Sequence, residues 1–161
     1  MTTLKIVPMV AAALIVLALV SGQLGLLSGT QPNNLGVHEG KLSPPAMSPN
    51  SISSQTDLYP DHPQRKAAAI APFNYTGPQT LAMEKLLQTL TATPGVKVVE
   101  SKADYVYAQA STPLMKFTDD LEFLFDPTKQ RIQLRSASRL GYSDLGANRA
   151  RMEDIRARFD R

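Results

Sequence analysis

The sequence of 161 residues contains no cysteine and only two histidines. Without cysteine, the chain has no disulfide, no thiolate metal site and no residue to acylate as a lipoprotein. His38 and His62 stand in polar stretches without the acid-bracketed spacing of a metal site, which also argues against a histidine-dependent nucleophile. The sequence therefore predicts neither a metal centre nor another cofactor.

A strong excess of charge is also absent, since the formal net charge is +3. Basic residues exceed acidic ones in residues 131–161, which hold eight arginines, no lysine and four acidic residues. These basic residues are not interleaved with aromatic residues, as they are in many nucleic-acid-binding surfaces. We therefore expect no nucleic-acid partner.

The N-terminal segment carries almost no charge. Lys5 precedes an apolar run at Ile6–Val20, and small and polar residues follow. This order is typical of a secretory signal, while Leu4–Leu27 approaches the roughly 20 apolar residues of a membrane-spanning helix. We predict that residues 1–29 are a signal peptide or a membrane anchor, and that the protein is exported and either membrane-anchored or periplasmic.

The rest of the chain divides by composition. Residues 30–63 are rich in proline, serine and asparagine and are predicted to be a linker and an irregular loop. Residues 64–161 are predicted to form one domain. Alternating or β-rich patterns predict strands at 67–75, 96–100, 105–110, 116–125 and 131–139. Helical patterns follow Thr76-Gly77-Pro78 and close the chain on a stripe of Leu145, Met152, Ile155 and Phe159.

This order predicts an α+β fold. We expect an antiparallel sheet of about five strands with two helices packed on one face, preceded by the hydrophobic N-terminal helix.

The loop DPTKQ joins the last two predicted strands and sets their register. If the apolar faces coincide, Phe125 lies beside Ile132 and Phe123 beside Leu134. A slip of one residue would place phenylalanines opposite arginines, so this register is strongly specified.

The same register brings charged residues together on the other face. It places Glu122 opposite Arg135 and Thr118 opposite Arg139, with Asp120 diagonal to both arginines. Asp119 is predicted on the apolar face near Ser138, at a strand end or paired with a helix residue such as Arg149. Asn148, in line with Leu145 and Met152, is expected to have a specific buried partner.

Three interpretations of these charges remain open. They can form a ladder of cross-strand ion pairs on a solvated face. They can form a site in which the arginine fork holds an anionic or carboxylate group. They can also carry acid–base catalysis through Asp120 and Glu122, although acids opposite arginines are held ionised and not tuned toward neutrality.

Three segments resemble a known family: SPNSISSQ, KFTDDLEFLFD and IQLRSASRLGYSDLGANRARMEDIR. Over about residues 40–159 the chain is similar to the family known as domain of unknown function 1499. The resemblance implies no activity. It does imply a candidate binding cluster of charged and polar residues: Asp119, Asp120, Glu122, Arg135, Ser136, Ser138, Arg139, Asp144, Asn148 and Arg149.

The chain departs from this family at one motif. Many relatives have a P-C-P-x-S-P-N-C-V-S-S-Q pattern, where this sequence has Pro45 and Ser51 in place of the two cysteines. Chemistry shared by the whole family must then lie elsewhere, which directs attention to the acidic and arginine residues.

We expect an envelope domain that is a binding or interaction module and not an enzyme. Its expected partners are a membrane, through the N-terminal segment, and an anionic small ligand or an envelope protein. The alternative is a small envelope enzyme that uses Asp120 and Glu122.

Overall fold

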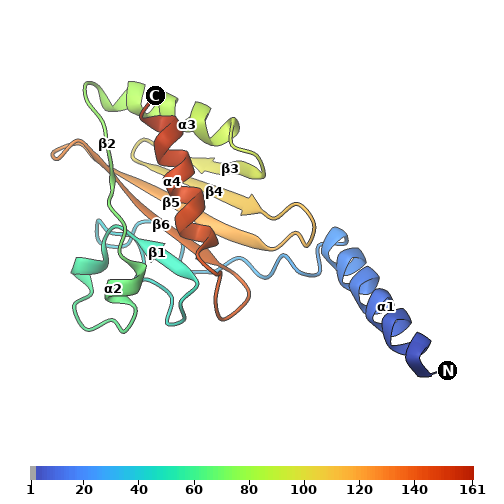
Figure 1. Ribbon diagram of the computed structural model, residues 1–161. Coiled ribbons are helices and arrows are strands. Elements are labelled where there is room, and N and C mark those ends of the chain that lie inside the picture. The colour runs from blue at the N-terminus through green and yellow to red at the C-terminus, as the bar shows by residue number, and fades with distance from the viewer. Residues whose placement is uncertain (1–2) are drawn as a thin grey trace.

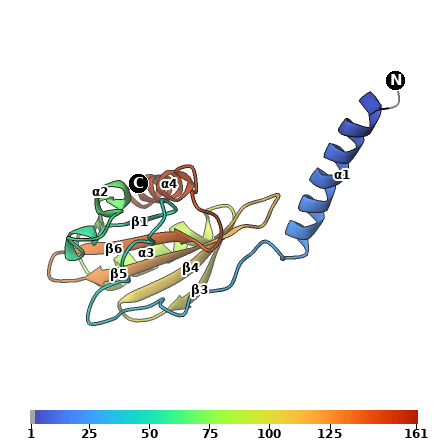
Figure 2. The ribbon, with the colours of Figure 1, turned by 90° about the horizontal axis from the view of Figure 1, so that it is seen from below.

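A computed structural model describes residues 3–161 of the chain, without the side chains of residues 3–6. The first two residues of the predicted N-terminal segment and the side chain of Lys5 thus lie outside the described part. Most of helix α1 (Thr3–Gln23) projects away from the rest of the molecule (Figures 1 and 2), and its last turn contacts the loop between β4 (Tyr105–Ser111) and β5 (Thr118–Asp126). Among the described residues, no helix is both long and apolar enough to cross a membrane.

The domain is built on a six-stranded sheet in the order β1-β6-β5-β4-β3, with β2 also paired to β6. All strand pairs are antiparallel. Strands β1 and β2 pair with different parts of the same edge of β6. The strands are β1 (Ser51–Ser53), β2 (Phe73–Asn74), β3 (Val96–Ser101), β4 (Tyr105–Ser111), β5 (Thr118–Asp126) and β6 (Arg131–Ser138).

The predicted register of the last hairpin is confirmed. Phe125 pairs with Ile132, Phe123 with Leu134 and Glu122 with Arg135. The α+β class and the antiparallel sheet are confirmed as well. The apolar alternation of these two strands therefore carried enough information to fix their pairing.

One core cluster joins a face of the sheet to helices α3 (Gln79–Thr91) and α4 (Ala147–Phe159). The helices contribute apolar residues at helical spacing, such as Leu86 and Leu90 from α3. Gly95, with a φ of 77°, turns the chain after α3, and a Cβ there would lie 2.8 Å from the carbonyl oxygen of Ser111. A side chain at this turn would therefore meet both backbone strain and a steric clash.

The structure differs from the predicted elements in three places. The predicted strand at 67–75 is short helix α2 (Arg65–Ala68) followed by β2, since Pro72 interrupts the segment. Strand β1 and the 3₁₀ helix at Thr56–Leu58 lie within the range predicted as linker and loop. Leu145 does not belong to the buried stripe of α4: it precedes the helix and is 95% exposed.

The face of the sheet opposite α4 is also covered. Residues 34–46, here named the cover segment, run along this face before the chain enters β1 (Figure 2). Leu42 of this segment is fully buried in a second apolar cluster with Tyr105, Tyr107 and Leu124. The polar residues predicted to be solvated therefore lie between the sheet and the cover segment.

Candidate functional site: the acid–arginine cluster

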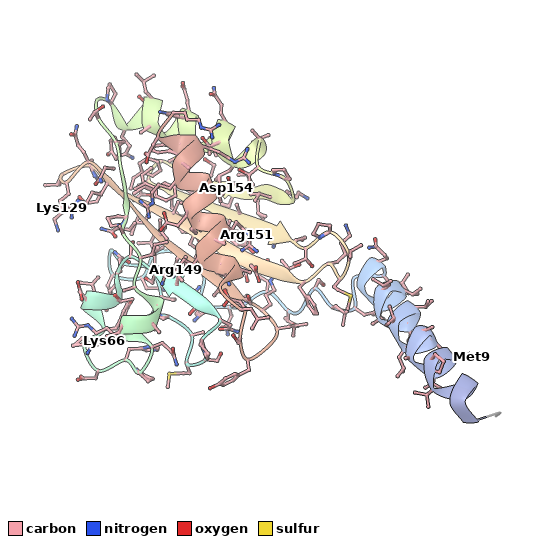
Figure 3. The ribbon with its side chains drawn as sticks, viewed as in Figure 1. Met9, Lys66, Lys129, Arg149, Arg151 and Asp154 are labelled. Carbon is pink, nitrogen blue, oxygen red and sulfur yellow. The ribbon has the colours of Figure 1, made fainter. Side chains whose placement is uncertain are left out.

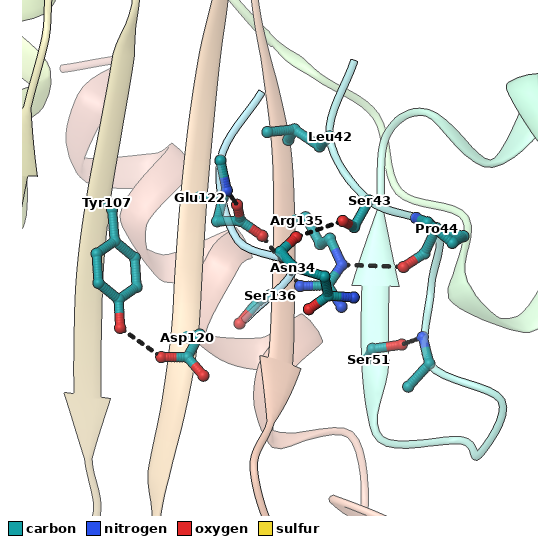
Figure 4. A network of polar contacts seen from close by, with 12 residues as sticks. Asn34, Leu42, Ser43, Pro44, Ser51, Tyr107, Asp120, Glu122, Arg135 and Ser136 are labelled. Atoms are coloured by element: carbon teal, nitrogen blue, oxygen red, sulfur yellow. Dashed lines mark hydrogen bonds and ion pairs between the residues drawn. The ribbon is translucent and has the colours of Figure 1, made fainter. Parts of the chain in front are cut away.

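Two ion pairs join β5 to β6 and to Arg139, the residue that follows β6. Figure 4 shows Asp120 of one pair and both members of the other, Glu122 and Arg135. We name their four residues the acid–arginine cluster: Asp120, Glu122, Arg135 and Arg139. Because side chains alternate along a strand, Asp120 and Glu122 point to the same face, away from Leu121 and Phe123 in the core. Strand alternation thus places both carboxylates together.

Glu122 and Arg135 form the first pair. Nη1 of Arg135 donates to Oε2 of Glu122 at 3.0 Å. The other carboxylate oxygen, Oε1, accepts hydrogen bonds from the Tyr105 hydroxyl at 2.9 Å and from the backbone N–H of Gly36 at 2.7 Å. The side chains of Glu122 and Arg135 are 0% and 6% exposed. The carboxylate is therefore surrounded by protein donors and has no open side.

Asp120 and Arg139 form the second pair, with two-point geometry. Nε of Arg139 donates to Oδ2 at 2.9 Å and Nη2 donates to Oδ1 at 2.7 Å. The Tyr107 hydroxyl also donates to Oδ1, at 2.6 Å, and accepts from the side-chain amide of Gln109 at 2.7 Å. Such a fork leaves little capacity for another anion at this arginine.

Burial determines the protonation of the two tyrosines. It raises the pKa of Tyr105 far above the usual range, and the charge and hydrogen bond of Glu122 raise it further. Burial also raises the pKa of Tyr107, as does its hydrogen bond to Asp120. The hydrogen bond to Asp120 raises the pKa of Arg139. Both tyrosines are therefore neutral donors at ordinary pH, and Arg139 stays charged.

The cover segment closes the cluster from above. Nε of Arg135 donates to the carbonyl oxygen of Pro44 at 3.0 Å, while Gly36 donates to Glu122. The Ser43 hydroxyl donates to the carbonyl oxygen of Asn34, which links the two ends of the segment (Figure 4). An ion pair between β5 and β6 thus also holds two points of the cover segment against the sheet.

A second polar group lies on the opposite face, between the sheet and α4. Asn148 is fully buried and its side-chain amide donates to the carbonyl oxygen of Asn50 at 3.1 Å and to the Ser138 hydroxyl at 3.0 Å. Its Oδ1 accepts from the Ser136 hydroxyl and, at 3.1 Å, from Nη1 of Arg151. This group, here named the helix-side cluster, consists of Asp119, Ser136, Ser138, Asn148 and Arg151.

The other two predicted site residues position α4 and its flanking loop. Asp144 accepts hydrogen bonds from the backbone N–H groups of Gly146 at 3.0 Å and Asn148 at 2.8 Å, and so satisfies N–H groups at the start of α4. Arg149 donates to the carbonyl oxygens of Ala67 and Ala69, both at 2.9 Å. These contacts attach α4 to the last turn of α2 and to the residue that follows it.

The ten predicted residues therefore do not form one site. Four make the acid–arginine cluster, and the other six lie on the helix side of the sheet or at the start of α4. Asp119 lies opposite Ser138 as predicted, but its partner is Arg151, at 2.6 Å, and not Arg149. The solvated-face interpretation is wrong, because the side chains of all four charged residues are between 0% and 7% exposed.

Sequence reasoning missed the tyrosines and the backbone groups that complete the cluster. Tyr107 pairs with Glu122 in the β4–β5 register, so it shares a face with both acids. A proposed register for these strands would have indicated both Tyr105 and Tyr107. No comparable pattern in the sequence indicated Gly36 or Pro44, because both lie in an irregular segment in which apolar and polar residues do not alternate.

The geometry of the acid–arginine cluster favours a structural role for its charged residues over a catalytic one. Each carboxylate accepts bonds from an arginine and a tyrosine, and neither faces open solvent. Within residues 3–161, no group of three or more histidine or acidic side chains is placed to hold a metal ion. The cluster can therefore hold segments together, but it presents no free acid, base or anion-binding fork.

Comparison with known families gives one result. The model of the family described as protein of unknown function (DUF1499) matches residues 41–159. This range holds all four residues of the acid–arginine cluster and all five of the helix-side cluster. The comparisons with curated proteins and with solved structures gave no match.

Proposed function

Since this chain belongs to the DUF1499 family, whose description assigns no activity, we propose a function from its own residues: a non-enzymatic interaction module that associates with a lipid surface through α1. The acid–arginine cluster has a structural part in this proposal, in which it holds the cover segment on the sheet. The observation that carries the proposal is the exposed apolar surface of α1 and of the two loops beside it.

Helix α1 is apolar on all sides and packs against little of the domain. Leu14, Ile15 and Leu17 are 61%, 62% and 62% exposed. Side chains project from α1 into open space, including the labelled Met9 (Figure 3). Exposed apolar surface of this extent is unfavourable in water and is typical of a membrane or protein contact. Because α1 carries no charge from Ile6 to its end, lipid is the partner that its composition favours.

The end of α1 lies against loops that expose further apolar residues. The side chain of Gln23 donates to the carbonyl oxygen of Leu114 at 2.8 Å, and a Cβ on Gly29 would lie 3.0 Å from Leu140. Three of the exposed residues, Phe117, Leu140 and Leu145, line one shallow cavity. We name the exposed apolar residues of these loops the apolar end: Leu114, Phe117, Leu140, Tyr142 and Leu145. It places apolar contacts where α1 would meet lipid.

Vesicle co-sedimentation tests the proposal with the full chain. We expect the protein to pellet with vesicles of phosphatidylcholine and phosphatidylglycerol. The double change Leu14→Asp and Leu17→Asp should weaken partitioning about tenfold or more, because charged groups are costly in lipid. Leu145→Asp should weaken it less, and Leu58→Asp, a change at an exposed apolar residue outside this surface, should have no effect. A wild-type protein that stays in the supernatant, or equal partitioning of all variants, would refute lipid association.

Export is a separate part of the proposal. Lys5, the apolar run and the small residues after it support a route out of the cytoplasm. Residues 1–29 fused to mature alkaline phosphatase should give activity in bacteria, because that enzyme requires disulfides that form outside the cytoplasm. Placing two aspartates in the run, at Leu14 and Leu17, should abolish the activity. An inactive wild-type fusion would contradict export.

The alternative of an enzyme using Asp120 and Glu122 has less support. A general acid or base must reach a substrate proton directly or through one water molecule. Both carboxylates are buried and already bonded to arginine and tyrosine. Interaction therefore remains the better proposal.

A further inference from the structure

A cavity of about 580 Å³ lies between the cover segment, the 3₁₀ helix at Thr56–Leu58 and the turn that joins β5 to β6. Among the described residues that line it, none belongs to the acid–arginine cluster, the helix-side cluster or α1. This volume is within the range of cavities that hold small organic molecules. The side chains of its walls therefore indicate which kind of molecule would fit.

Gln55 lines this cavity and has one unbonded end of its amide. The residue is 8% exposed, and its Oε1 accepts a hydrogen bond from the backbone N–H of Leu42 at 2.8 Å. Its Nε2 donates to no residue that the structure describes. This nitrogen keeps accessible surface, because within the described part of the chain the Tyr75 hydroxyl is the one unbonded side-chain atom that is fully buried. Since Gln55 is otherwise enclosed, its NH2 group faces the cavity.

Gln133 adds a second amide to the same cavity. It lies opposite Leu124 in the β5–β6 register, on the side of the sheet that the cover segment covers. Its Oε1 accepts from the Ser54 hydroxyl at 2.7 Å, and its Nε2 has no partner among residues 7–161. Water satisfies such groups in an empty cavity, and a ligand with oxygen acceptors can replace that water. Two NH2 donors therefore favour a ligand that carries hydroxyl or carbonyl oxygens.

The charge of the lining favours a cation. Asp104 and Asp126 line the cavity and form no ion pair within the described part of the chain, and the same is true of Lys129. Asp57 also lines the cavity, but Arg65 lies 2.8 Å from it and matches its charge. The unpaired groups thus carry one net negative charge. This charge attracts a ligand with one positive charge and disfavours a carboxylate or a phosphate.

We propose that this cavity binds a hydroxylated primary amine, the chemical class of the amino sugars. The ammonium group pairs with Asp104 and Asp126, and hydroxyl oxygens of the ligand accept from Gln55 and Gln133. The C–H groups of the ring pack against Leu58, which lines the cavity and is 53% exposed. The inference is independent of lipid association, because the cavity includes no described residue of α1 or of the apolar end.

Binding is measured on the full chain by ligand-observed NMR titration with three probes: glucosamine, glucose and cyclohexylamine. Glucose lacks the ammonium group and cyclohexylamine lacks the hydroxyls, and the pH is set so that both amines are protonated. We expect glucosamine to bind at millimolar concentration and each of the other probes to bind about tenfold more weakly, because each lacks one set of polar contacts.

The double change Asp104→Asn and Asp126→Asn should weaken glucosamine binding about tenfold, because it removes the charge from both contacts to the ammonium group. The amide at residue 126 can still accept the backbone N–H of Lys129, as Oδ1 of Asp126 does. Asp154→Asn, at an exposed acid on α4 (Figure 3), is the matched control and should bind like the wild type.

The side-chain amide signals test the contact with the two glutamines. In a nitrogen–proton correlation spectrum of the folded protein, glucosamine should shift the NH2 signals of Gln55 and Gln133 and leave that of Gln88, an exposed residue on α3, in place. Gln55→Glu identifies the first signal by its loss and keeps an acceptor for Leu42. Failure of glucosamine to bind, equally tight binding of glucose or cyclohexylamine, equal binding to the wild type and the double variant, or unshifted signals of both glutamines at saturation would each overturn the inference.

Discussion

Loss of Arg135 is expected to be among the most destabilising changes in the domain. Arg135→Met removes the positive partner of Glu122, whose side chain is 0% exposed, and leaves the carboxylate with the hydroxyl of Tyr105 and the N–H of Gly36. The change also removes the donor to the carbonyl oxygen of Pro44. Breaking a buried pair and stranding its charge costs about 3–5 kcal/mol of the free energy of unfolding.

Glu122→Gln is expected to cost less. The glutamine Oε1 can still accept from Tyr105 and Gly36, while Arg135 keeps Pro44 as an acceptor. The change removes one charged hydrogen bond, worth about 1.5–3 kcal/mol. It also places the glutamine NH2 group opposite the Nη1 donor of Arg135, so we expect a cost at the upper end of this range. In the double variant no charge is stranded, so its destabilisation should be smaller than the sum of the two single effects by about 2 kcal/mol.

Urea unfolding of the full chain, followed by circular dichroism, measures these differences. The matched control is Arg158→Met, which breaks the pair with Asp154 on the surface of α4, where the side chains are 38% and 52% exposed. Exposed pairs contribute about 0–1 kcal/mol. If Arg135→Met costs no more than this control, or if the two changes at the buried pair are additive, the reasoning about a closed cluster is refuted.

Three further changes test other contacts. Tyr107→Phe removes a hydrogen bond to Asp120 and should cost about 1–2 kcal/mol in the same urea assay; no measurable cost would argue against this bond. Asn148→Ala leaves the carbonyl oxygen of Asn50 without its side-chain donor and should lower the free energy of unfolding by about 2–3 kcal/mol, and a neutral result in calorimetry would contradict the helix-side cluster. Although burial acts to raise the pKa of Asp144, the N–H donors outweigh it and the pKa lies below its ordinary value of 3.8. The stabilisation by the ionised Asp144 carboxylate is therefore present above pH 3.8 and is lost as the pH falls through the lower folded pKa. Asp144→Ala should lower the Tm near neutral pH and have no such effect in acid. A Tm difference independent of pH would contradict the hydrogen bonds from Asp144 to the start of α4.

The parts of the fold that sequence predicted well depend on periodicity. Phe123, Phe125, Ile132 and Leu134 alternate with polar residues, and only one antiparallel register buries all four. The pairing of Glu122 with Arg135 followed from that register without any structural information.

The parts that sequence did not predict depend on irregular backbone. The cover segment has many polar residues and no period, so its burial could not be inferred from composition. Its contacts to the sheet are made largely through backbone groups, such as the N–H of Gly36 and the carbonyl oxygen of Pro44. Such groups are common to every residue, and residue types therefore give little indication of them.

The ion-pair partner of Asp119 is a further feature that the sequence did not predict. Alternation placed it correctly on the helix side of β5, opposite Ser138. Its partner on α4 depends on which face of the helix is turned toward β5. The predicted apolar stripe included Leu145 and so placed this residue within the helix, although α4 begins at Ala147. With α4 starting at Ala147, Arg151 and not Arg149 reaches Asp119.

Hydrogen–deuterium exchange of the cover segment tests most directly whether the acid–arginine cluster holds this segment on the sheet. The full-length wild type, Arg135→Met and Arg158→Met would be compared under conditions in which all three are folded. We predict slow exchange at the amide of Gly36 in the wild type and in Arg158→Met, and faster exchange across residues 34–46 in Arg135→Met while β5 and β6 stay protected. Fast exchange of the cover segment in the wild type, or unchanged protection in Arg135→Met, would contradict this role.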